Sequence, residues 1–343
     1  MKKLVQLVIG TAVSGGSLYL AFRGVEFDKL SEAFGNVTWW PLIPILAMWF
    51  VHYALRALRW RYLLPDAPHV GDAGPGGEER GEPVSLRALF DSIILGNLAS
   101  FILPFRLGEF IRPLILTRWS NYSFASAFAS VVIERFFDLA AVLLSLACIV
   151  PLLPDLPGEA KVVALSFGAL ALALLVFMVG SCLVPNLVRR VVGVCARPLP
   201  RFLRDFSIRF CDDLLKGTAV VATVPRLTAI IVLTAVVWAT SYAQFYLQYM
   251  MFPEPYSVLL AVTTGVLVAL AVAAPSTPGF VGVFQAGCVA AAALMQYPIP
   301  TAQAYSLLVH LLVYLLIVGA GFILLMIHDL SLGELKSAVK QQK

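Results

Sequence analysis

Charged side chains are scarce in this chain of 343 residues, of which aspartate, glutamate, lysine and arginine make up only 13%. Soluble domains carry about 25% charged residues, so the chain has too little polar material to cover a surface that faces water. The net charge is +5, but the basic residues gather in a few connecting segments and form no nucleic-acid motif. The composition therefore excludes an ordinary soluble domain and predicts no nucleic-acid partner.

Patterns that bind metals are also missing. The five cysteines are scattered without a Cys-x-x-Cys spacing or a neighbouring histidine, and the four histidines are dispersed. We therefore expect no metal, no cofactor and no disulfide framework. His52 and His310 lie in apolar segments, where a hydrogen bond between helices is the simpler role and a ligand role is the alternative.

Long hydrophobic runs dominate the sequence, which is 60% hydrophobic with a mean hydropathy of +0.86. A helix needs about 20 mostly apolar residues to cross a bilayer. Six runs meet that length, near 4–22, 40–63, 122–151, 161–185, 225–250 and 302–328. The first could be a cleaved signal peptide, but it continues past the small residues where cleavage would fall, which favours a retained span. The sequence thus predicts an all-α polytopic membrane protein with about six full spans.

Two further apolar regions are interrupted. Residues 86–118 are broken between Pro104 and Gly108, and residues 257–297 are broken between Pro275 and Gly279. Each region predicts a helix–break–helix hairpin that is re-entrant, meaning that it enters the membrane and returns to the same side. The second region has longer arms and could instead form two full crossings, which would leave the downstream orientation unchanged.

The distribution of basic residues predicts the orientation. Lysines and arginines precede the first span, end the second, fill residues 186–217 and close the chain, and all can be cytoplasmic at once. Both termini are then cytoplasmic. In this topology residues 160–343 repeat the order of residues 1–153 upside down, within a single integral membrane domain that covers 1–343. Inverted repeats with interrupted helices are a transporter architecture, with the binding site near the midplane.

Two connecting segments differ in character. Residues 65–83 are rich in proline, glycine and acidic residues and predict a flexible cytoplasmic loop. Residues 186–217 are basic, and Phe202, Phe206 and Phe210 recur four apart. This linker predicts an amphipathic helix on the inner leaflet, with a helical cap packed on the bundle as the alternative.

Charge occurs where lipid is expected. Glu134, Arg135 and Asp138 lie in the span at 122–151, and Glu134 is about 18 Å along it, near the bilayer centre. Because each ionised group costs roughly 2.5–3.5 kcal/mol there, the three must be paired or line a wet cavity.

The first break supplies partners for these charges. Arg106, Glu109 and Arg112 follow at three-residue spacing around Gly108. The two groups together hold three arginines and three carboxylates, which could form a purely structural ion network. The other interpretation is that the pocket also binds an anionic substrate group, because the planar guanidinium fork suits phosphate or carboxylate.

The second break offers backbone groups to the same region. A helix that begins at Pro278 would aim its positive dipole end there, and Gly279 and Gly282 permit close backbone approach. Gln285 could donate a hydrogen bond to a headgroup.

Several other polar residues have simpler interpretations. Asp91 and Asn97 on the first arm could line the path, although satisfying buried backbone groups is the simpler role. The basic cluster at the end of the second span is interpreted as a membrane-interface anchor, with the alternative that Arg56 or Arg59 faces the cavity. The cluster consists of Arg56, Arg59, Trp60 and Arg61.

Four stretches resemble the membrane domain of bacterial lysylphosphatidylglycerol synthases, which also occurs as stand-alone flippase-like proteins. They are RALRWRYLL (56–64), GNLASFILPFRLGEFIRP (96–113), VVIERFFDLA (131–140) and APSTPGFVGVFQAG (274–287). The resemblance covers nearly the whole chain and implies the bacterial cytoplasmic membrane. By position, it implies substrate contacts for Arg106, Gly108, Glu109, Glu134, Arg135, Asp138, Pro278, Gly279 and Gly282. Gln285 stands where the family often has an acidic residue, which weakens a proton-relay role at that position.

The leading hypothesis is a flippase that moves a phospholipid or polyprenyl-linked lipid with a charged headgroup between leaflets, not an enzyme. The first alternative is an accessory or scaffold subunit that binds a membrane or enzyme partner. A less favoured alternative is an integral-membrane enzyme acting on lipid headgroups, for which carboxylates near arginines would supply acid–base groups. A homo-oligomer is compatible with each hypothesis.

Overall fold

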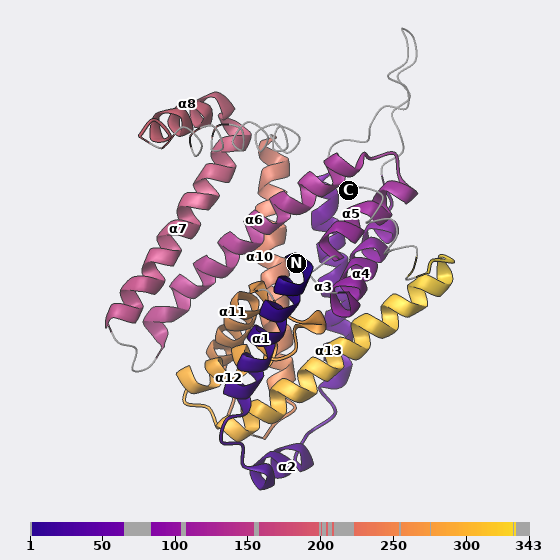
Figure 1. Ribbon diagram of the computed structural model, residues 1–343, viewed down its shortest axis with the longest axis vertical. Helices are drawn as coiled ribbons and strands as arrows, with labels where there is room; N and C mark the ends of the chain where they lie inside the picture. The colour runs from indigo at the N-terminus through magenta and orange to yellow at the C-terminus, as the bar shows by residue number, and fades with distance from the viewer. Residues whose placement is uncertain are drawn as a thin grey trace.

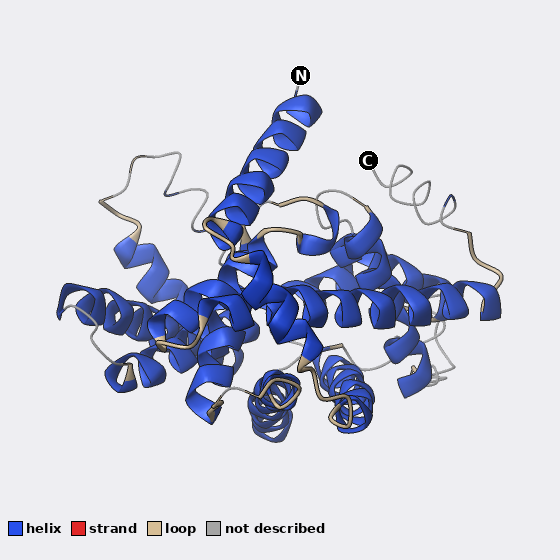
Figure 2. Ribbon diagram, turned by 90° about the horizontal axis from the view of Figure 1, so that it is seen from below, coloured by secondary structure: helices blue, strands red, loops and turns tan. Residues whose placement is uncertain are grey.

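The computed structural model describes residues 2–64, 84–103, 108–153, 158–198, 223–253, 255–274 and 276–331, with isolated positions at 200, 204, 208 and 333. Helices make up nearly all of these segments, and Figure 2 shows no strand among them. The predicted loop at 65–83 and most of the linker beyond residue 198 lie outside the described residues, as do Arg106 and Pro275. The chain is an all-helical protein in the part that the structure describes.

Each predicted span is a helix in the structure, with ends that shift by a few residues. The helices are α1 (Lys2–Phe22), α3 (Leu42–Leu63), α6 (Phe124–Ile149), α7 (Gly158–Leu183), α10 (Val224–Tyr249) and α13 (Ile299–Ile327). Of the helices in the described segments, α3, α10, α13 and α6 with its short extension η2 (Val150–Leu152) are long and apolar enough to cross a membrane.

Both interrupted regions form pairs of packed helices. The first pair is α4 (Leu86–Ile102) with α5 (Gly108–Trp119), and the second is α11 (Val258–Ala273) with α12 (Val283–Leu294), separated by the turn η4 (Pro278–Phe280). Serine caps start three of the long helices, because the hydroxyls of Ser85, Ser123 and Ser257 each accept a hydrogen bond from the backbone of the first turn.

The breaks of the two hairpins meet. Phe101, near the end of α4, lies edge-on to Phe280 of η4 with ring centroids 5.6 Å apart. Tyr314 of α13 also packs against Phe101, with ring centroids 5.7 Å apart. The hairpins are therefore in contact through their broken ends, and these ends are the natural place to look for a site.

Two large apolar clusters hold the molecule together. The first is built mainly from α3, α4, α6 and α7 and centres on residues such as Trp60, Leu89 and Phe137. The second is built mainly from α10 to α13, where Tyr249 and Tyr305 stack with ring centroids 4.0 Å apart. Each half of the chain thus supplies most of one cluster.

Two short helices lie outside this scheme. Helix α8 (Pro185–Cys195) begins the basic linker, and Figure 1 places it at one end of α7, at the edge of the molecule. Helix α2 (Phe27–Gly35) was not predicted, because polar residues interrupt its nine positions and leave no long apolar run. Burial of Ala33 and a hydrogen bond from the Thr38 amide to the Met251 carbonyl (2.7 Å) hold this region against the α10–α11 connection.

The periphery of the molecule is less tightly packed than its centre. Figure 1 shows α7 beside α6 at one side and α13 running diagonally across the front. Figure 2 shows the N-terminal end of α1 projecting from the body. Among the residues of α1 from 11 to 22, only Ser14 and Ala21 are buried. These outlying surfaces are apolar, as expected where lipid surrounds a protein.

Candidate functional site

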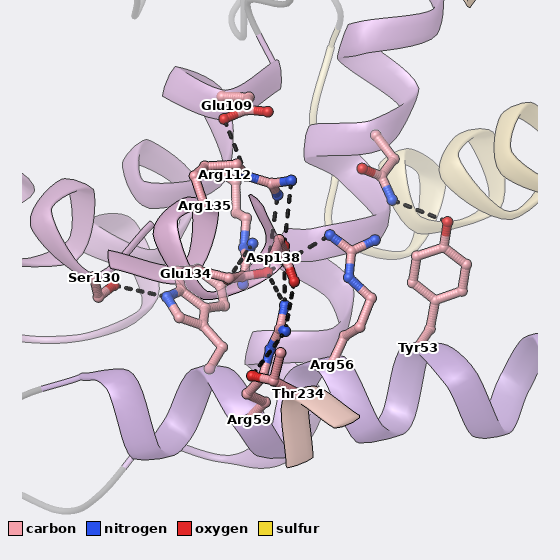
Figure 3. Close-up of polar contacts among 12 residues, drawn as sticks. Tyr53, Arg56, Arg59, Glu109, Arg112, Ser130, Glu134, Arg135, Asp138 and Thr234 are labelled. Carbon is pink, nitrogen blue, oxygen red and sulfur yellow. Dashed lines mark hydrogen bonds and ion pairs between the residues drawn. The ribbon is translucent and has the colours of Figure 1, made fainter. Parts of the chain in front are cut away.

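A buried carboxylate lies at the centre of the charged residues of α6. Glu134 has no exposed surface, and its Oε1 accepts a hydrogen bond from Arg59 Nη2 at 2.9 Å (Figure 3). Arg59 is itself 1% exposed and also donates from Nη1 to Asp138 Oδ1 at 2.6 Å. The guanidinium fork thus joins the two carboxylates, which lie four apart on one helix face, in a charge-assisted arrangement.

Arg112 approaches the same carboxylate from the first hairpin. Its Nη1 lies 2.8 Å from Glu134 Oε2, yet the groups are not aligned for a hydrogen bond. The guanidinium carbon lies 3.8 Å from the centroid of the Trp60 ring, and the Trp60 indole donates to Ser130 Oγ at 2.8 Å. Among the described residues, no group accepts a hydrogen bond from Nε, Nη1 or Nη2 of Arg112, although the residue is only 4% exposed. Nη1 is ion-paired with Glu134, and the remaining donors of this buried fork suit an anion.

Looser ion pairs surround this centre. Arg135 Nε lies 3.4 Å from Glu109 Oε2, and its Nη1 lies 3.5 Å from Asp138 Oδ2. Arg56 Nη2 lies 3.8 Å from Glu134 Oε1. The side chain of Arg135 is 43% exposed, so these contacts can rearrange at little cost. We call the seven residues the ion network: Arg56, Arg59, Glu109, Arg112, Glu134, Arg135 and Asp138.

A cavity of about 270 Å³ opens beside the ion network. Arg56, Arg112 and Arg135 line it together with Glu109, and Asn97 and Ser100 add neutral polar groups. The second hairpin contributes Val272 and Phe280 to the wall. We call this space the cationic cavity, because arginines outnumber carboxylates among its lining residues. It can hold a small anionic group between the two hairpin breaks.

Gly108 lines the cationic cavity and also sets the hairpin geometry. A Cβ atom at Gly108 would lie 1.9 Å from the carbonyl oxygen of Gly96, and one at Gly96 would lie 2.8 Å from the Cβ of Arg112. The two glycines therefore let α4 and α5 approach closely enough to place Arg112 over Glu134. Close backbone approach at glycine is a common basis of helix association in membranes.

The residues that the sequence predicted at the second break, Pro278, Gly279 and Gly282, are not among the described residues that line the cavity. Gly279 and Gly282 have φ values of 73° and 88°, which side chains disfavour, and Pro278 precedes them. Gly282 packs against α1, where a Cβ would lie 2.1 Å from the Ser14 carbonyl oxygen. Their neighbour Phe280 is the residue of this turn that reaches the cavity wall.

Both polar atoms of the Gln285 side chain contact other groups of the protein. Its Oε1 accepts a hydrogen bond from the Gly282 amide at 2.8 Å, and its Nε2 lies 2.8 Å from His310 Nδ1. The other ring nitrogen of His310, Nε2, lies 2.7 Å from the Gly279 carbonyl oxygen, which can only accept a hydrogen bond. His310 Nε2 therefore donates to Gly279, and His310 Nδ1 accepts from Gln285 Nε2. This closed chain fixes the shape of the break, and it gives His310 the structural role predicted for it. His52 likewise bonds across helices, to Thr240 at 3.0 Å.

The structure corrects the interface-anchor interpretation of the basic cluster on α3. Arg59 and Trp60 are buried, whereas Arg61 is exposed. Residues 56, 59, 60 and 63 share one face of the helix, and this face turns toward α6. The sequence offered one indication of the role of Arg59, because carboxylates as deep in an apolar helix as Glu134 and Asp138 require a cationic partner from another helix. Asn97 lines the cavity and donates to the Tyr53 hydroxyl at 3.1 Å, while buried Asp91 pairs with His328 at 2.9 Å.

Across the described segments, no three histidine, cysteine, aspartate or glutamate side chains are grouped so as to hold a metal ion. The arrangement instead offers arginine forks, a cavity of limited size and walls drawn from both hairpins. Such an arrangement suits an anionic group.

Comparison with known proteins gives one match. Residues 7–321 match the family described as the lysylphosphatidylglycerol synthase TM region, and no curated protein and no solved structure matches the chain. The match covers both hairpins, the ion network and the helices that are long enough to cross a membrane, except for the last residues of α13. The chain is therefore a multi-pass membrane protein that belongs to the lysylphosphatidylglycerol synthase transmembrane-region family.

Proposed function

We propose that the protein is a lipid flippase, which moves a phospholipid or a polyprenyl-linked lipid with an anionic or otherwise charged headgroup between the two leaflets. The observation that carries the proposal is the buried Arg112 fork beside the cationic cavity, which has no hydrogen-bond acceptor in the segments that the structure describes. A phosphate oxygen in that cavity would accept these hydrogen bonds and offset the cost of burying the guanidinium. The proposal requires binding and release only, with no covalent step.

The proposed architecture is an inverted repeat, with residues 1–153 as one half and residues 160–343 as the other. Its support is the pair of helix–break–helix hairpins, the contact of Phe101 with Phe280 and the presence of one large apolar cluster in each half. Six helices, including α1 and α7, would cross fully and both hairpins would be re-entrant. Alternating access would then rock one half against the other around the cationic cavity, where the breaks meet.

The proposed location is the bacterial cytoplasmic membrane, with both termini in the cytoplasm. Support comes from exposed Arg61 at the end of α3 and from Arg189 and Arg190 on α8, which would lie on the same side. The charge of the buried arginines on α3 belongs to the site and does not contribute to this count.

Native mass spectrometry combined with a leaflet-exchange assay tests the proposal. Wild-type protein, Arg112→Gln and the control Arg61→Gln would be purified gently and then reconstituted with a fluorescent phosphatidylglycerol whose outer-leaflet pool is bleached by dithionite. We expect a co-purified anionic lipid and measurable exchange in wild type and Arg61→Gln. Both should be lost in folded Arg112→Gln.

Two outcomes would oppose the proposal. If Arg112→Gln folds and retains both the lipid and the exchange rate, the arginine fork is not the headgroup site. If wild type carries bulk lipid only and exchanges none, while Arg112→Gln unfolds, the ion network is structural and an accessory-subunit role is favoured. Arg56→Gln, at the edge of the network, is a milder variant for the case in which Arg112→Gln does not fold.

A further inference from the structure

A second cavity, of about 310 Å³, lies between α6, α7 and α10. Its lining is almost wholly apolar, and α6 and α10 contribute alanines to it. Ala140 and Ala141 stand on α6, and Ala235 and Ala239 stand on α10. Because these side chains are small, they leave space between the two helices unfilled. We call this space the alanine groove.

The polar atoms in the wall of the alanine groove are already satisfied. The Trp238 indole donates to Asp138 Oδ1 at 3.1 Å, and the Tyr242 hydroxyl donates to Ser145 Oγ at 2.8 Å. Thr234 accepts a hydrogen bond from Arg59 Nη1 at 3.3 Å. The remaining lining side chains are apolar, so the groove suits a ligand that has no polar groups of its own.

The position of the groove identifies that ligand. Its residues span 137–145 on α6 and 231–242 on α10, which are the middle parts of two helices long enough to cross the membrane. Ile231, Ala235 and Ala239 are exposed, so the groove opens sideways from the bundle at that depth. The medium at the middle of a bilayer is hydrocarbon.

We infer that the alanine groove binds one acyl chain of a resident membrane phospholipid, distinct from the lipid whose headgroup enters the cationic cavity. The two spaces use different faces of α6, since Val131 and Arg135 line the cationic cavity whereas Phe137, Ala140 and Ala141 line the groove. Arg59, Glu134 and Asp138 form a hydrogen-bonded partition between them. The bound chain packs against Trp238, one of the residues that hold Asp138 in this partition.

Photolabelling tests the inference without requiring transport. Full-length protein would be reconstituted in vesicles of phosphatidylethanolamine and phosphatidylglycerol that contain a phosphatidylglycerol with a diazirine midway along one acyl chain. Peptide mass spectrometry would then compare labelling in wild type, in Ala235→Phe/Ala239→Phe and in the control Val232→Phe/Val236→Phe. Val232 and Val236 are 53% and 38% exposed and lie outside the groove, on the same helix.

We expect groove residues on α6 and α10 to label above Val232 and Val236 in wild type, because a held chain remains beside them. In Ala235→Phe/Ala239→Phe, the labelling of the groove residues should fall to the level at positions 232 and 236. In the control variant, the groove residues should keep their excess labelling. Equal labelling of groove and exposed residues in wild type, or the same loss in both double variants, overturns the inference. If the double variant does not fold, Ala235→Leu alone repeats the test with a smaller side chain.

Arg112→Gln separates this inference from the proposed function. We expect Arg112→Gln to keep the groove labelling, since the groove does not contact Arg112. If the labelling falls together with headgroup binding, the chain belongs to the transported lipid and the claim of a resident lipid is wrong. If the protein exchanges no lipid but the groove still labels selectively, the inference stands and the flippase proposal fails.

Discussion

Glu134 is the residue on which the charged part of the site depends. It lies 2.9 Å from Arg59 and 2.8 Å from Arg112, and its own side chain has no exposure. Arg56 and Arg135 add longer contacts at 3.8 Å. One carboxylate therefore compensates four arginines, which come from α3, α5 and α6, and its loss would leave the buried guanidinium groups of Arg59 and Arg112 without sufficient counter-charge.

We predict that Glu134→Gln lowers the free energy of unfolding by roughly 3–5 kcal/mol, the usual cost of breaking a buried ion pair from one side. The matched control is Glu109→Gln, whose side chain is 32% exposed and whose contact with Arg135 is 3.4 Å long. Its expected cost is below about 1 kcal/mol. Thermal unfolding of both variants in the same detergent measures the difference. Equal shifts would show that burial does not set the value of these pairs.

At the residue scale the sequence predicted one side of this network and offered the other side, Arg56 and Arg59, only as an alternative. Charge in the middle of an apolar run identified Glu134, Arg135 and Asp138, and three-residue spacing joined Glu109 to Arg112. Arg59 was first interpreted as an interface anchor, with a place at the cavity as the alternative, because a basic residue near a helix end has two favourable environments, the lipid headgroups and a buried carboxylate. Spacing along one helix cannot choose between them, since the choice depends on which face meets α6.

Among the helices and their connections, the first hairpin depends most closely on Gly108, which sets how near α4 and α5 can approach. A methyl group there would lie 1.9 Å from the Gly96 carbonyl oxygen, so α4 and α5 would have to separate. We predict that Gly108→Ala lowers the free energy of unfolding by about 1–3 kcal/mol through overpacking. The control is Gly193→Ala on α8, which meets nothing within 4 Å and replaces glycine in a helix with a better helix former. Thermal unfolding should separate the two, and a neutral Gly108→Ala would mean that the hairpin opens without strain.

The second break depends on its hydrogen-bonded chain through Gln285 and His310. We predict that His310→Ala speeds hydrogen exchange of the amides between 277 and 282, because the Gly279 carbonyl and the Gln285 amide lose their shared partner. His52→Ala is the control, since it removes one helix-to-helix hydrogen bond away from the break. Exchange followed by mass spectrometry checks the prediction, and unchanged protection of 277–282 in His310→Ala would contradict it. The sequence suggested Gln285 as a hydrogen-bond donor to a headgroup. It could not show the true partner, because the position of a glutamine after a break does not indicate that a distant histidine accepts a hydrogen bond from its side-chain amide.

At the scale of the whole molecule, hydropathy alone was enough to place the long helices and both interrupted pairs. It was enough because lipid imposes one rule on every spanning segment, the internal satisfaction of backbone hydrogen bonds. Helix α2 escaped prediction since short polar helices are stabilised by tertiary contacts, here the packing of Ala33 and the bond from Thr38 to Met251. The meeting of the two breaks was expected from the proposed inverted order of the halves, and the contact of Phe101 with Phe280 agrees with it.

That contact leads to a prediction about the movement of the whole protein. If the halves rock against each other, the two hairpin breaks must separate during each cycle. In a background where all five cysteines are replaced, Phe101→Cys/Phe280→Cys should form a disulfide on oxidation. We expect the oxidised protein to exchange no lipid and the reduced protein to exchange lipid again. Each single-cysteine variant, oxidised in the same way, controls for the loss of one aromatic ring and should retain exchange. Full exchange by the cross-linked protein would show that the breaks stay together, and lipid would then have to pass through a fixed path beside the ion network.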